Sequence, residues 1–302
     1  MPIQNEAALH HIREFHSPKR VAKAVSLLSQ PGAAAVAGGT DVAVDYREDL
    51  EVLVDITRLG LNKIRRRQGA LHIGAAVTMH DLTSSRTIRR LADGILADAA
   101  ESFISQQIRN TATLGGNLAR GSPAADLPPA LLALDAVAEI RGAKPEGGLE
   151  ERRVPLTEFF TGPGKSVLGG GLLVGVAVPP ADGRRGSFLK IGRTAEDIAL
   201  VNAGVSLRLE DGRCRDVRIA LGAVGPTPMR VPEAEAVLEG QAPTAGLLED
   251  AARIVREGVE PIDDHRAGAV YRRKVSGVLA RRGLEACLRN AGLQAVAGRG
   301  EG

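Results

Sequence analysis

Residues 107–119 read Gln-Ile-Arg-Asn-Thr-Ala-Thr-Leu-Gly-Gly-Asn-Leu-Ala, and residues 122–126 read Ser-Pro-Ala-Ala-Asp immediately before an apolar segment. Hydroxyl, amide and carboxylate side chains, at Thr113, Asn117 and Asp126, stand beside bare glycine backbone. Backbone of this kind ahead of a helix N-terminus favours the anionic groups of a ligand. The serine and the aspartate of the second stretch, taken alone, are more often helix caps than ligands. The two stretches therefore predict a ligand site, with helix caps as the alternative interpretation.

Another glycine turn lies upstream, where Gly38-Gly39-Thr40-Asp41 follows residues 33–37, a short apolar segment typical of a buried strand. Two successive glycines let the backbone approach a ligand closely and point several N–H groups into one concavity, which suits a pyrophosphate. Alone, such a pair is more often a plain tight turn. Its spacing is neither that of a dinucleotide-binding G-x-G-x-x-G nor that of a P-loop. Together the two turns predict one elongated ligand that is held at two places.

Apolar periodicity around these turns predicts a mixed α and β chain. Helical spacing runs between Pro18 and Pro31 and over residues 91–105, 127–138 and 231–290. The expected strands cover residues 33–37, 51–56, 70–75, 201–210 and 215–224, the last two forming a hairpin around Asp211-Gly212. Residues 78–81 resemble a capping box ahead of another helix. The pattern changes near residues 181–186, which predicts a domain boundary there.

The composition is that of a globular chain with few aromatic side chains. The 302 residues suffice for about two domains, and the 44% hydrophobic and 25% charged residues exclude wholesale disorder. Because only 2% are aromatic and the net charge is +3, we expect no nucleic-acid partner. The basic segment 271–289 has apolar residues at helical spacing, which predicts an amphipathic helix with a solvated face. A surface for a partner subunit is the alternative.

Cysteine and histidine usage limits the metal chemistry. Cys214 and Cys287 are the only cysteines, so the chain cannot supply four thiolates for an iron-sulfur cluster or a zinc site. The six histidines show no metal-ligand spacing. The longest apolar stretch, residues 167–180, is interrupted by glycines and is too short for a membrane span. We therefore expect a cytoplasmic protein with neither a metal site nor a membrane span.

Motifs along nearly the whole chain, in the same order, resemble the FAD subunit of molybdenum hydroxylases. The closest patterns are the medium subunit of carbon monoxide dehydrogenase and the flavin domain of xanthine dehydrogenase. The glycine motif of residues 107–117 with the following Ser-Pro-Ala-Ala-Asp is highly specific, whereas the upstream turn alone is not. The residues that carry the resemblance are 37–41, 73–75, 107–117, 122–134, 188–190, 195–199 and 271–274.

The resemblance implies a noncovalent FAD site and assigns residues to it. The segment that matches the family's pyrophosphate-wrapping segment is Ala37, Gly38, Gly39, Thr40 and Asp41. The segment that matches the second FAD-binding segment is Thr113, Leu114, Gly115, Gly116 and Asn117. Three single positions match an aromatic, an acidic and a basic FAD contact, namely Phe103, Asp126 and Lys190. Asp197 and Ile198 match the loop beside the isoalloxazine in xanthine dehydrogenase. A turn residue is the alternative interpretation of Asp197, and carbon monoxide dehydrogenase has an aromatic residue in place of Ile198.

The resemblance also implies an α+β fold with two domains. Residues 1–181 would form a two-part FAD-binding domain of the PCMH (vanillyl-alcohol-oxidase-like) type, with subdomains of about 1–57 and 58–181. Residues 186–290 would form a C-terminal domain, like that of the carbon monoxide dehydrogenase flavoprotein, with a small antiparallel sheet and helices. Residues 291–302 are expected to be a frayed tail.

The function implied is that of an electron-transfer subunit, because a flavin accepts electrons singly and releases them in pairs. The molybdenum cofactor and the iron-sulfur clusters would then reside on a large and a small partner subunit. A dimer of such heterotrimers would pass electrons to an external acceptor, and this chain would need no catalytic nucleophile, base or metal. Two alternatives stay open at this point: a self-contained flavin reductase of the cell-wall precursor type, and a degenerate binding module without enzyme activity.

Overall fold

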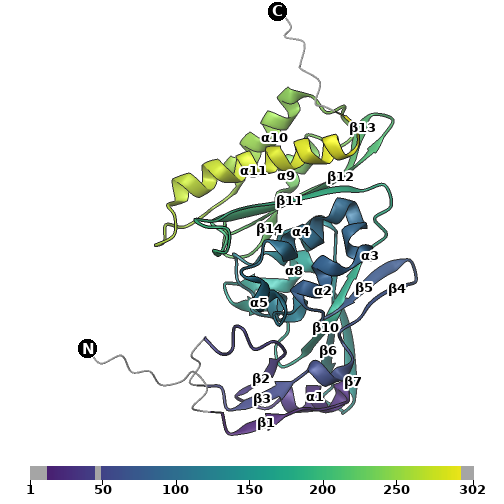
Figure 1. The fold of residues 1–302 in the computed structure, drawn as a ribbon, viewed down its shortest axis with the longest axis vertical. Helices are drawn as coiled ribbons and strands as arrows, with labels where there is room; N and C mark the ends of the chain where they lie inside the picture. Colours follow the sequence, from purple (N-terminus) through teal and green to yellow (C-terminus); the bar gives the residue numbers. More distant parts are fainter. Residues whose placement is uncertain (1–11, 45–48, 294–302) are drawn as a thin grey trace, which may run out of the picture.

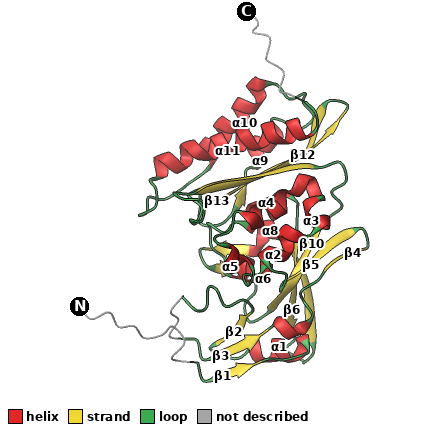
Figure 2. Ribbon diagram, viewed as in Figure 1, coloured by secondary structure: helices red, strands yellow, loops and turns green. Residues whose placement is uncertain are grey.

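The computed structural model describes residues 12–44 and 49–293. The chain forms an elongated molecule in which three larger sheets follow one another along the long axis (Figure 1). Helices gather beside the second and third of these sheets, as colouring by secondary structure shows (Figure 2). Within the described ranges, no helix is both long and apolar enough to cross a bilayer.

The first sheet is small, parallel and built from N-terminal residues. Its strands are, in spatial order, β1 (Glu14–His16), β3 (Val52–Asp55) and β2 (Ala33–Val36). Parallel neighbours cannot be joined by a tight turn, and helix α1 (Val21–Leu28) forms the crossover between β1 and β2. The buried face of α1 packs on Val52 and Val54. A short 3-10 helix, η1 (Thr57–Leu59), leads out of this unit.

The second sheet is antiparallel and contacts the largest apolar core. Its strands are, in spatial order, β4 (Ile64–Arg67), β5 (Ala70–Gly74), β10 (Leu172–Val178), β6 (Val137–Ala143) and β7 (Leu149–Pro155). Inward-facing strand residues such as Leu71 and Val176 share this core with several short helices. These helices are α2 (Met79–Ser84), α3 (Arg86–Arg89), η2 (Leu91–Gly94), α4 (Ile95–Glu101), α5 (Gln106–Arg109), α6 (Leu114–Ala119), α7 (Leu127–Ala133) and α8 (Leu156–Phe159). A small hairpin of β8 (Phe160–Gly162) and β9 (Lys165–Ser166) follows α8.

The third sheet is also antiparallel and lies between two layers of helices. Its strands are, in spatial order, β11 (Arg185–Ile191), β12 (Val201–Glu210), β13 (Arg213–Gly222) and β14 (Met229–Arg230). One face is covered by α10 (Ala245–Gly258) and α11 (Ala269–Asn290), while α9 (Pro232–Ala236) lies beside β13. The other face turns toward α4 (Figure 1) and also contacts α7. The C-terminal sheet therefore packs directly on the helices of the preceding unit.

The apolar segment 127–138 does not form one helix, as its pattern predicts. Helix α7 ends at Ala133, the backbone of Asp135 is left-handed (φ 52°), and β6 follows directly. The Asp135 carboxylate accepts hydrogen bonds from Arg218 and Arg230, which lie far away in the sequence. Such tertiary contacts fix the turn and are invisible to local periodicity.

Two other segments that were predicted to be helical are interrupted in the structure. In the segment 91–105, the left-handed residues Ala92 and Asp93 lie within η2 and break the helical pattern there, and α4 ends at Glu101. The segment 231–290 holds three helices joined by loops rather than one continuous pattern. The spacing of apolar residues does not predict such interruptions, because they depend on the backbone conformation of single residues and on loops.

The predicted capping box and the predicted hairpin are confirmed, whereas the predicted tail is not tested. The Thr78 hydroxyl accepts from the backbone N–H of Asp81, whose carboxylate accepts from the N–H of Thr78, so the capping box is present. The hairpin around Asp211-Gly212 forms, and its second strand begins at Arg213. The predicted frayed tail, residues 291–302, lies outside the described residues from 294 onward.

Candidate functional site

A cavity of about 720 Å³ lies where the first sheet, the short helices and the β11–β12 loop meet. Cofactor and small-molecule sites typically have volumes of roughly 300–1,000 Å³. The walls come from both glycine turns, from a further glycine run between β9 and β10, and from the β11–β12 loop. The lining residues are Leu28, 33–42, Phe103, Ile104, Ile108, Ala112, Thr113, Gly116, Asn117, Ala119, Arg120, Ser122, 124–126, Gly164, 168–171 and Ile198.

This cavity brings together most of the residues that the sequence predicts for the site. Those that line it are Ala37, Gly38, Gly39, Thr40, Asp41, Phe103, Thr113, Gly116, Asn117, Asp126 and Ile198. The other four predicted residues, Leu114, Gly115, Lys190 and Asp197, are not among the lining residues. Two segments far apart in the sequence thus meet at one cavity, as the elongated-ligand hypothesis requires.

The first glycine turn offers unused backbone donors to the cavity. Gly39 has a left-handed backbone (φ 69°), which glycine adopts without strain. A Cβ on Gly38 would overlap the carbonyl group of Thr111, so glycine is needed there to bring the two turns into contact. Among the described residues, the N–H groups of residues 38–41 have no hydrogen-bond acceptor. They are therefore free to bind an anionic ligand group.

The second glycine turn uses its backbone donors within the protein. The N–H groups of Leu114 and Gly115 donate to Val77 O (2.9 Å) and Ala75 O (2.8 Å), and the Gly116 N–H donates to Thr113 Oγ1 (3.1 Å). Leu114 is fully buried in the core. These bonds dock α6 on the residues that follow β5, so only one face of this turn is presented to the cavity.

The sequence predicts that the N-terminus of α7 favours an anionic ligand group, but the structure leaves few N–H donors there. Pro128 and Pro129 have no N–H, and the N–H of Leu127 donates to Asn117 Oδ1 (3.4 Å). The N-terminus of α7 therefore has little to offer an anion. Ser122 accepts from the N–H of Ala124 (3.3 Å) in the turn before α7 and lines the cavity, so it is not the helix cap of the alternative interpretation.

Asp126 is neither a helix cap nor an isolated carboxylate. It makes no side-chain capping bond and is only 4% exposed. Its Oδ2 lies 3.0 Å from Lys190 Nζ, and its Oδ1 accepts from Asn202 Nδ2 at 3.1 Å. Burial raises the pKa of Asp126, and the charge and hydrogen bond of Lys190 together with the Asn202 amide oppose that shift.

The β11–β12 loop presents an apolar side chain at the edge of the cavity. Ile198 lines the cavity and is 52% exposed, which is unusual for an isoleucine. The Asp197 carboxylate turns back into its own loop, where it accepts from the Thr194 N–H (3.2 Å) and from Arg193 Nε (3.3 Å). This is the turn geometry that the alternative interpretation of Asp197 describes.

Two parts of the cavity wall were missed by the sequence analysis. Arg120 follows the second glycine motif, lines the cavity, and its Nε lies 2.7 Å from Asp41 Oδ2. Residues 169–171 form a glycine run in the wall. The sequence did show this run, but we interpreted it only as an interruption of an apolar stretch.

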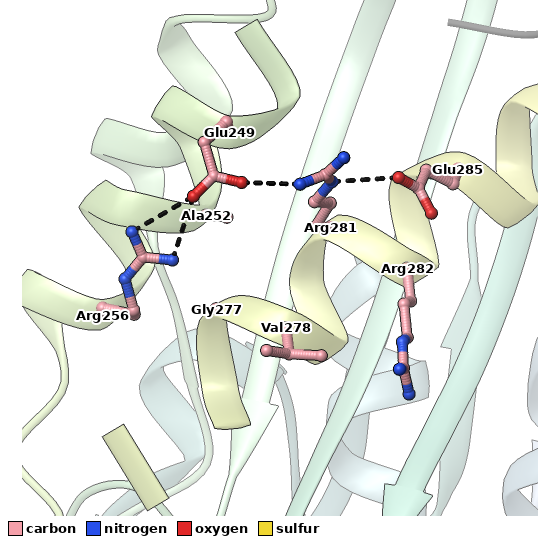
Figure 3. Close-up of a pocket in the computed structure, with 8 residues that line it drawn as sticks. All are labelled: Glu249, Ala252, Arg256, Gly277, Val278, Arg281, Arg282 and Glu285. Atoms are coloured by element: carbon pink, nitrogen blue, oxygen red, sulfur yellow. Dashed lines mark hydrogen bonds and ion pairs between the residues drawn. The ribbon is translucent and has the colours of Figure 1, made fainter. Parts of the chain in front are cut away.

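A second hollow, of about 370 Å³, lies between α10 and α11 and contains no predicted site residue. Its charged groups bind one another: Glu249 contacts Arg256 at 3.3 Å and Arg281 at 2.8 Å, and Arg281 also contacts Glu285 at 3.0 Å (Figure 3). The described ranges contain no group of three or more His, Cys, Asp or Glu residues placed to hold a metal ion.

Comparison with known proteins gives matches over nearly the whole chain. Residues 10–181 match the family described as the FAD binding domain in molybdopterin dehydrogenase, and residues 186–287 match the carbon monoxide dehydrogenase flavoprotein C-terminal domain. The carbon monoxide dehydrogenase medium chain of Afipia carboxidovorans is 33% identical over 280 residues, which cover 90% of this chain and 95% of that protein. The xanthine dehydrogenase FAD-binding subunit of Escherichia coli O157:H7 is 34% identical over 268 residues, covering 85% and 90%.

Solved structures give the same result. A chain of carbon monoxide dehydrogenase from Hydrogenophaga pseudoflava aligns with a TM-score of 0.84 at 34% identity, covering 91% of this chain and 96% of that chain. A chain of quinoline 2-oxidoreductase from Pseudomonas putida 86 aligns with a TM-score of 0.82 at 28% identity, covering 92% and 97%.

The fold and the matches define the class as flavoprotein subunits of oxidoreductases. The chain belongs to the family of FAD-binding subunits of molybdenum hydroxylases, which includes carbon monoxide dehydrogenase medium chains and xanthine dehydrogenase FAD subunits. The α+β fold implied by the resemblance, an FAD-binding domain followed by a C-terminal domain of antiparallel strands and helices, is confirmed.

The cavity fits FAD on grounds of its own chemistry. It has the volume of a cofactor site, a glycine turn with free N–H donors for a pyrophosphate, and apolar lining residues that include Phe103 and Ile108. Among the residues that the structure describes, its lining contains no histidine, cysteine or tyrosine.

Proposed function

We propose that this chain holds FAD noncovalently in the cavity and passes electrons from iron-sulfur clusters of a partner subunit to an external acceptor. The observation that carries the proposal is the cavity itself, which combines a donor-rich glycine turn at one place with an exposed apolar side chain, Ile198, at another. Bound FAD would supply the exchange between one-electron and two-electron transfer. The chain would bind, orient and partly expose it.

Different site residues are proposed to bind different parts of FAD. The N–H groups of residues 38–41 would bind the pyrophosphate, and Arg120 would balance the charge of Asp41 beside it. Thr113, Gly116 and Asn117 would form the second contact. Phe103, Asp126 and Ile198 would line the rest, Ile198 beside the isoalloxazine.

The partner subunits follow from the family and from the thiols of this chain. Its relatives are named as medium chains and FAD-binding subunits, and its own Cys214 and Cys287 are buried and free. We propose a large subunit with the molybdenum cofactor, a small iron-sulfur subunit, and a dimer of such heterotrimers. The cytoplasmic location and the external acceptor stay predictions.

The domain limits are proposed at residues 1–181 and 186–290, with subdomains of about 1–57 and 58–181. The two family matches, residues 10–181 and 186–287, support this division. The separate apolar clusters around α1, around α4 and α7, and between the third sheet and α11 support it further. No observation favours the flavin reductase or the binding-module alternative.

The first prediction concerns the cofactor and its attachment. The purified chain should be yellow, with the visible absorption of an oxidised flavin. Acid precipitation should release that colour into the supernatant, because the described part of the cavity lining offers no histidine, cysteine or tyrosine for a covalent link. Flavin that stays in the pellet would contradict noncovalent binding, and a protein that neither contains nor takes up FAD would refute the proposed function.

A further inference from the structure

A run of cations lies on an edge strand away from the cofactor cavity. Residues 63–67 read Lys-Ile-Arg-Arg-Arg, and all four cations are exposed. Within the described residues, β4 is an outermost strand of the second sheet and pairs with β5 alone. The turn between these strands consists of Gln68 and Gly69, both left-handed, which is the tight connection that fixes the register of a hairpin. The hairpin projects from the side of the molecule (Figure 1).

The outer edge of β4 keeps free backbone groups. Ile64 lies opposite Ile73 in the antiparallel pair, and the N–H of Gly74 donates to the carbonyl of Lys63 (3.0 Å). Successive residues of such a strand alternate between bonding to the partner strand and pointing away from it. The N–H and C=O groups of Ile64 and Arg66 therefore point away from β5, and no group that the structure describes bonds to them. An added strand would bond at these groups.

The four cations at this edge have no anionic partner. None of their side chains forms an ion pair or a hydrogen bond with a residue that the structure describes. By contrast, the exposed Arg253 on α10 is paired with Glu257. The alternation of side chains along β4 places Arg65 and Arg67 on one face and Arg66 on the other. The edge therefore carries uncompensated positive charge on both faces.

We propose that the outer edge of β4 binds an extended acidic segment of a partner protein, which adds to the second sheet as a further strand. Backbone bonds to Ile64 and Arg66 would hold the segment, and its carboxylates would pair with the arginines. The inference goes beyond the proposed function, because none of residues 63–67 lines the cofactor cavity.

The hairpin favours this occupant over three others. A second copy of the chain would bring the same arginines edge to edge, and like charges opposite each other destabilise strand pairing. A bilayer surface would need apolar anchors, but residues 61–74 have no large apolar side chain that is exposed. A nucleic acid would leave the free backbone edge unused, and residues 61–74 offer no Phe, Tyr or Trp for stacking on bases. An extended acidic peptide uses both the edge and the charge.

The test measures binding of a synthetic peptide in which threonine and glutamate alternate, by fluorescence anisotropy at low salt, where exposed charges are least screened. We expect Arg65→Glu/Arg67→Glu to weaken binding about tenfold, because two attractions become repulsions. Arg65→Gln/Arg67→Gln should lie between this variant and the unaltered chain. Lys19→Glu/Lys23→Glu is the matched control, since it changes the net charge equally at exposed positions near α1, and it should bind as the unaltered chain does.

Two further measurements test the strand pairing itself and need no variant. The same peptide with every backbone nitrogen methylated keeps its carboxylates but cannot donate to β4, so it should bind about tenfold more weakly. Hydrogen exchange followed by NMR should show slower exchange at the N–H groups of Ile64 and Arg66 when the unmethylated peptide is bound. The N–H of Arg65, which faces β5, should change little.

Several results would overturn the proposal. Absence of peptide binding at low salt, or equal binding by the charge-reversed variant and its control, would remove the role of the arginines. Equal binding of the methylated peptide, with unchanged exchange at Ile64 and Arg66, would rule out strand addition. Tighter binding of phosphatidylserine vesicles or duplex DNA than of the peptide, lost in Arg65→Glu/Arg67→Glu, would reassign this edge to a membrane surface or a nucleic acid.

Discussion

At the scale of single residues, glycines in the cavity wall are needed for different reasons. A side chain at Gly38 or Gly115 would collide with the backbone of another segment, so these two glycines are required for packing. Gly116 is different, because the nearest atom to an added Cβ is Thr113 Oγ1 at 3.2 Å and the remaining space is the cavity. A substitution at Gly116 should therefore affect the ligand more than the fold.

This difference leads to a prediction for Gly116→Val. We expect FAD affinity to fall at least tenfold, since the branched side chain would occupy ligand space, while the thermal midpoint of the apo protein changes by only a few degrees. Gly246→Val is the matched control: Gly246 also lies in the first turn of a helix, and its nearest contact is also a threonine Oγ1, Thr244 at 3.9 Å. Titration with FAD and thermal unfolding of both apo variants provide the measurement. Equal FAD affinities would contradict the placement of the site.

At the scale of elements, the turn between α7 and β6 is fixed by charge. Asp135 binds Arg218 and Arg230, and its Oδ2 lies 3.6 Å from the Nη2 of Arg184, whose side chain is 7% exposed. Burial lowers the pKa of Arg184, and the nearby Asp135 carboxylate opposes that shift. This carboxylate links the turn after α7 to β13 and β14.

The corresponding prediction is that Asp135→Ala destabilises the protein by about 2–4 kcal/mol, because it removes a partner of a buried guanidinium. Asp211→Ala is the control, since Asp211 also has a left-handed backbone (φ 51°) but lies in an exposed hairpin turn. It should cost about 1 kcal/mol through backbone strain alone. Urea unfolding of the two variants measures the difference, and equal losses would show that the ion pairs contribute nothing.

The reach of sequence reasoning can be judged from the same residues. The glycine turns could be found because glycine pairs beside hydroxyl and amide side chains leave a local pattern. Periodicity predicted the strands β2, β3, β5, β12 and β13 but not the other strands of the three large sheets. The pairing of Lys190 with Asp126 could not be found, because the two residues are far apart in the chain and meet only after the third sheet packs on α7. The end of α7 at Ala133 was missed for the same reason, since arginines on β13 and β14 fix the next turn.

At the scale of the whole molecule, the first sheet, the helices beside the second sheet and the C-terminal sheet all contribute to the cavity. The first sheet supplies the glycine turn with free donors, the helical unit supplies the second motif, and the C-terminal sheet supplies Ile198 at the edge and Lys190 behind the wall. Such a composite site can hold an elongated cofactor while leaving one end accessible. This arrangement suits a subunit that exchanges electrons with partners at its surface.

The central claim is that this chain relays electrons and does not oxidise an organic substrate by itself. Stopped-flow absorbance should follow cluster and flavin bleaching separately, first in the isolated subunit and then in the complex reconstituted with the iron-sulfur and molybdenum subunits. We expect the isolated subunit to be reduced by dithionite but not by the substrate of the holoenzyme, and substrate-dependent flavin reduction to follow cluster reduction in the complex. Oxidation of that substrate by the isolated subunit would contradict the account.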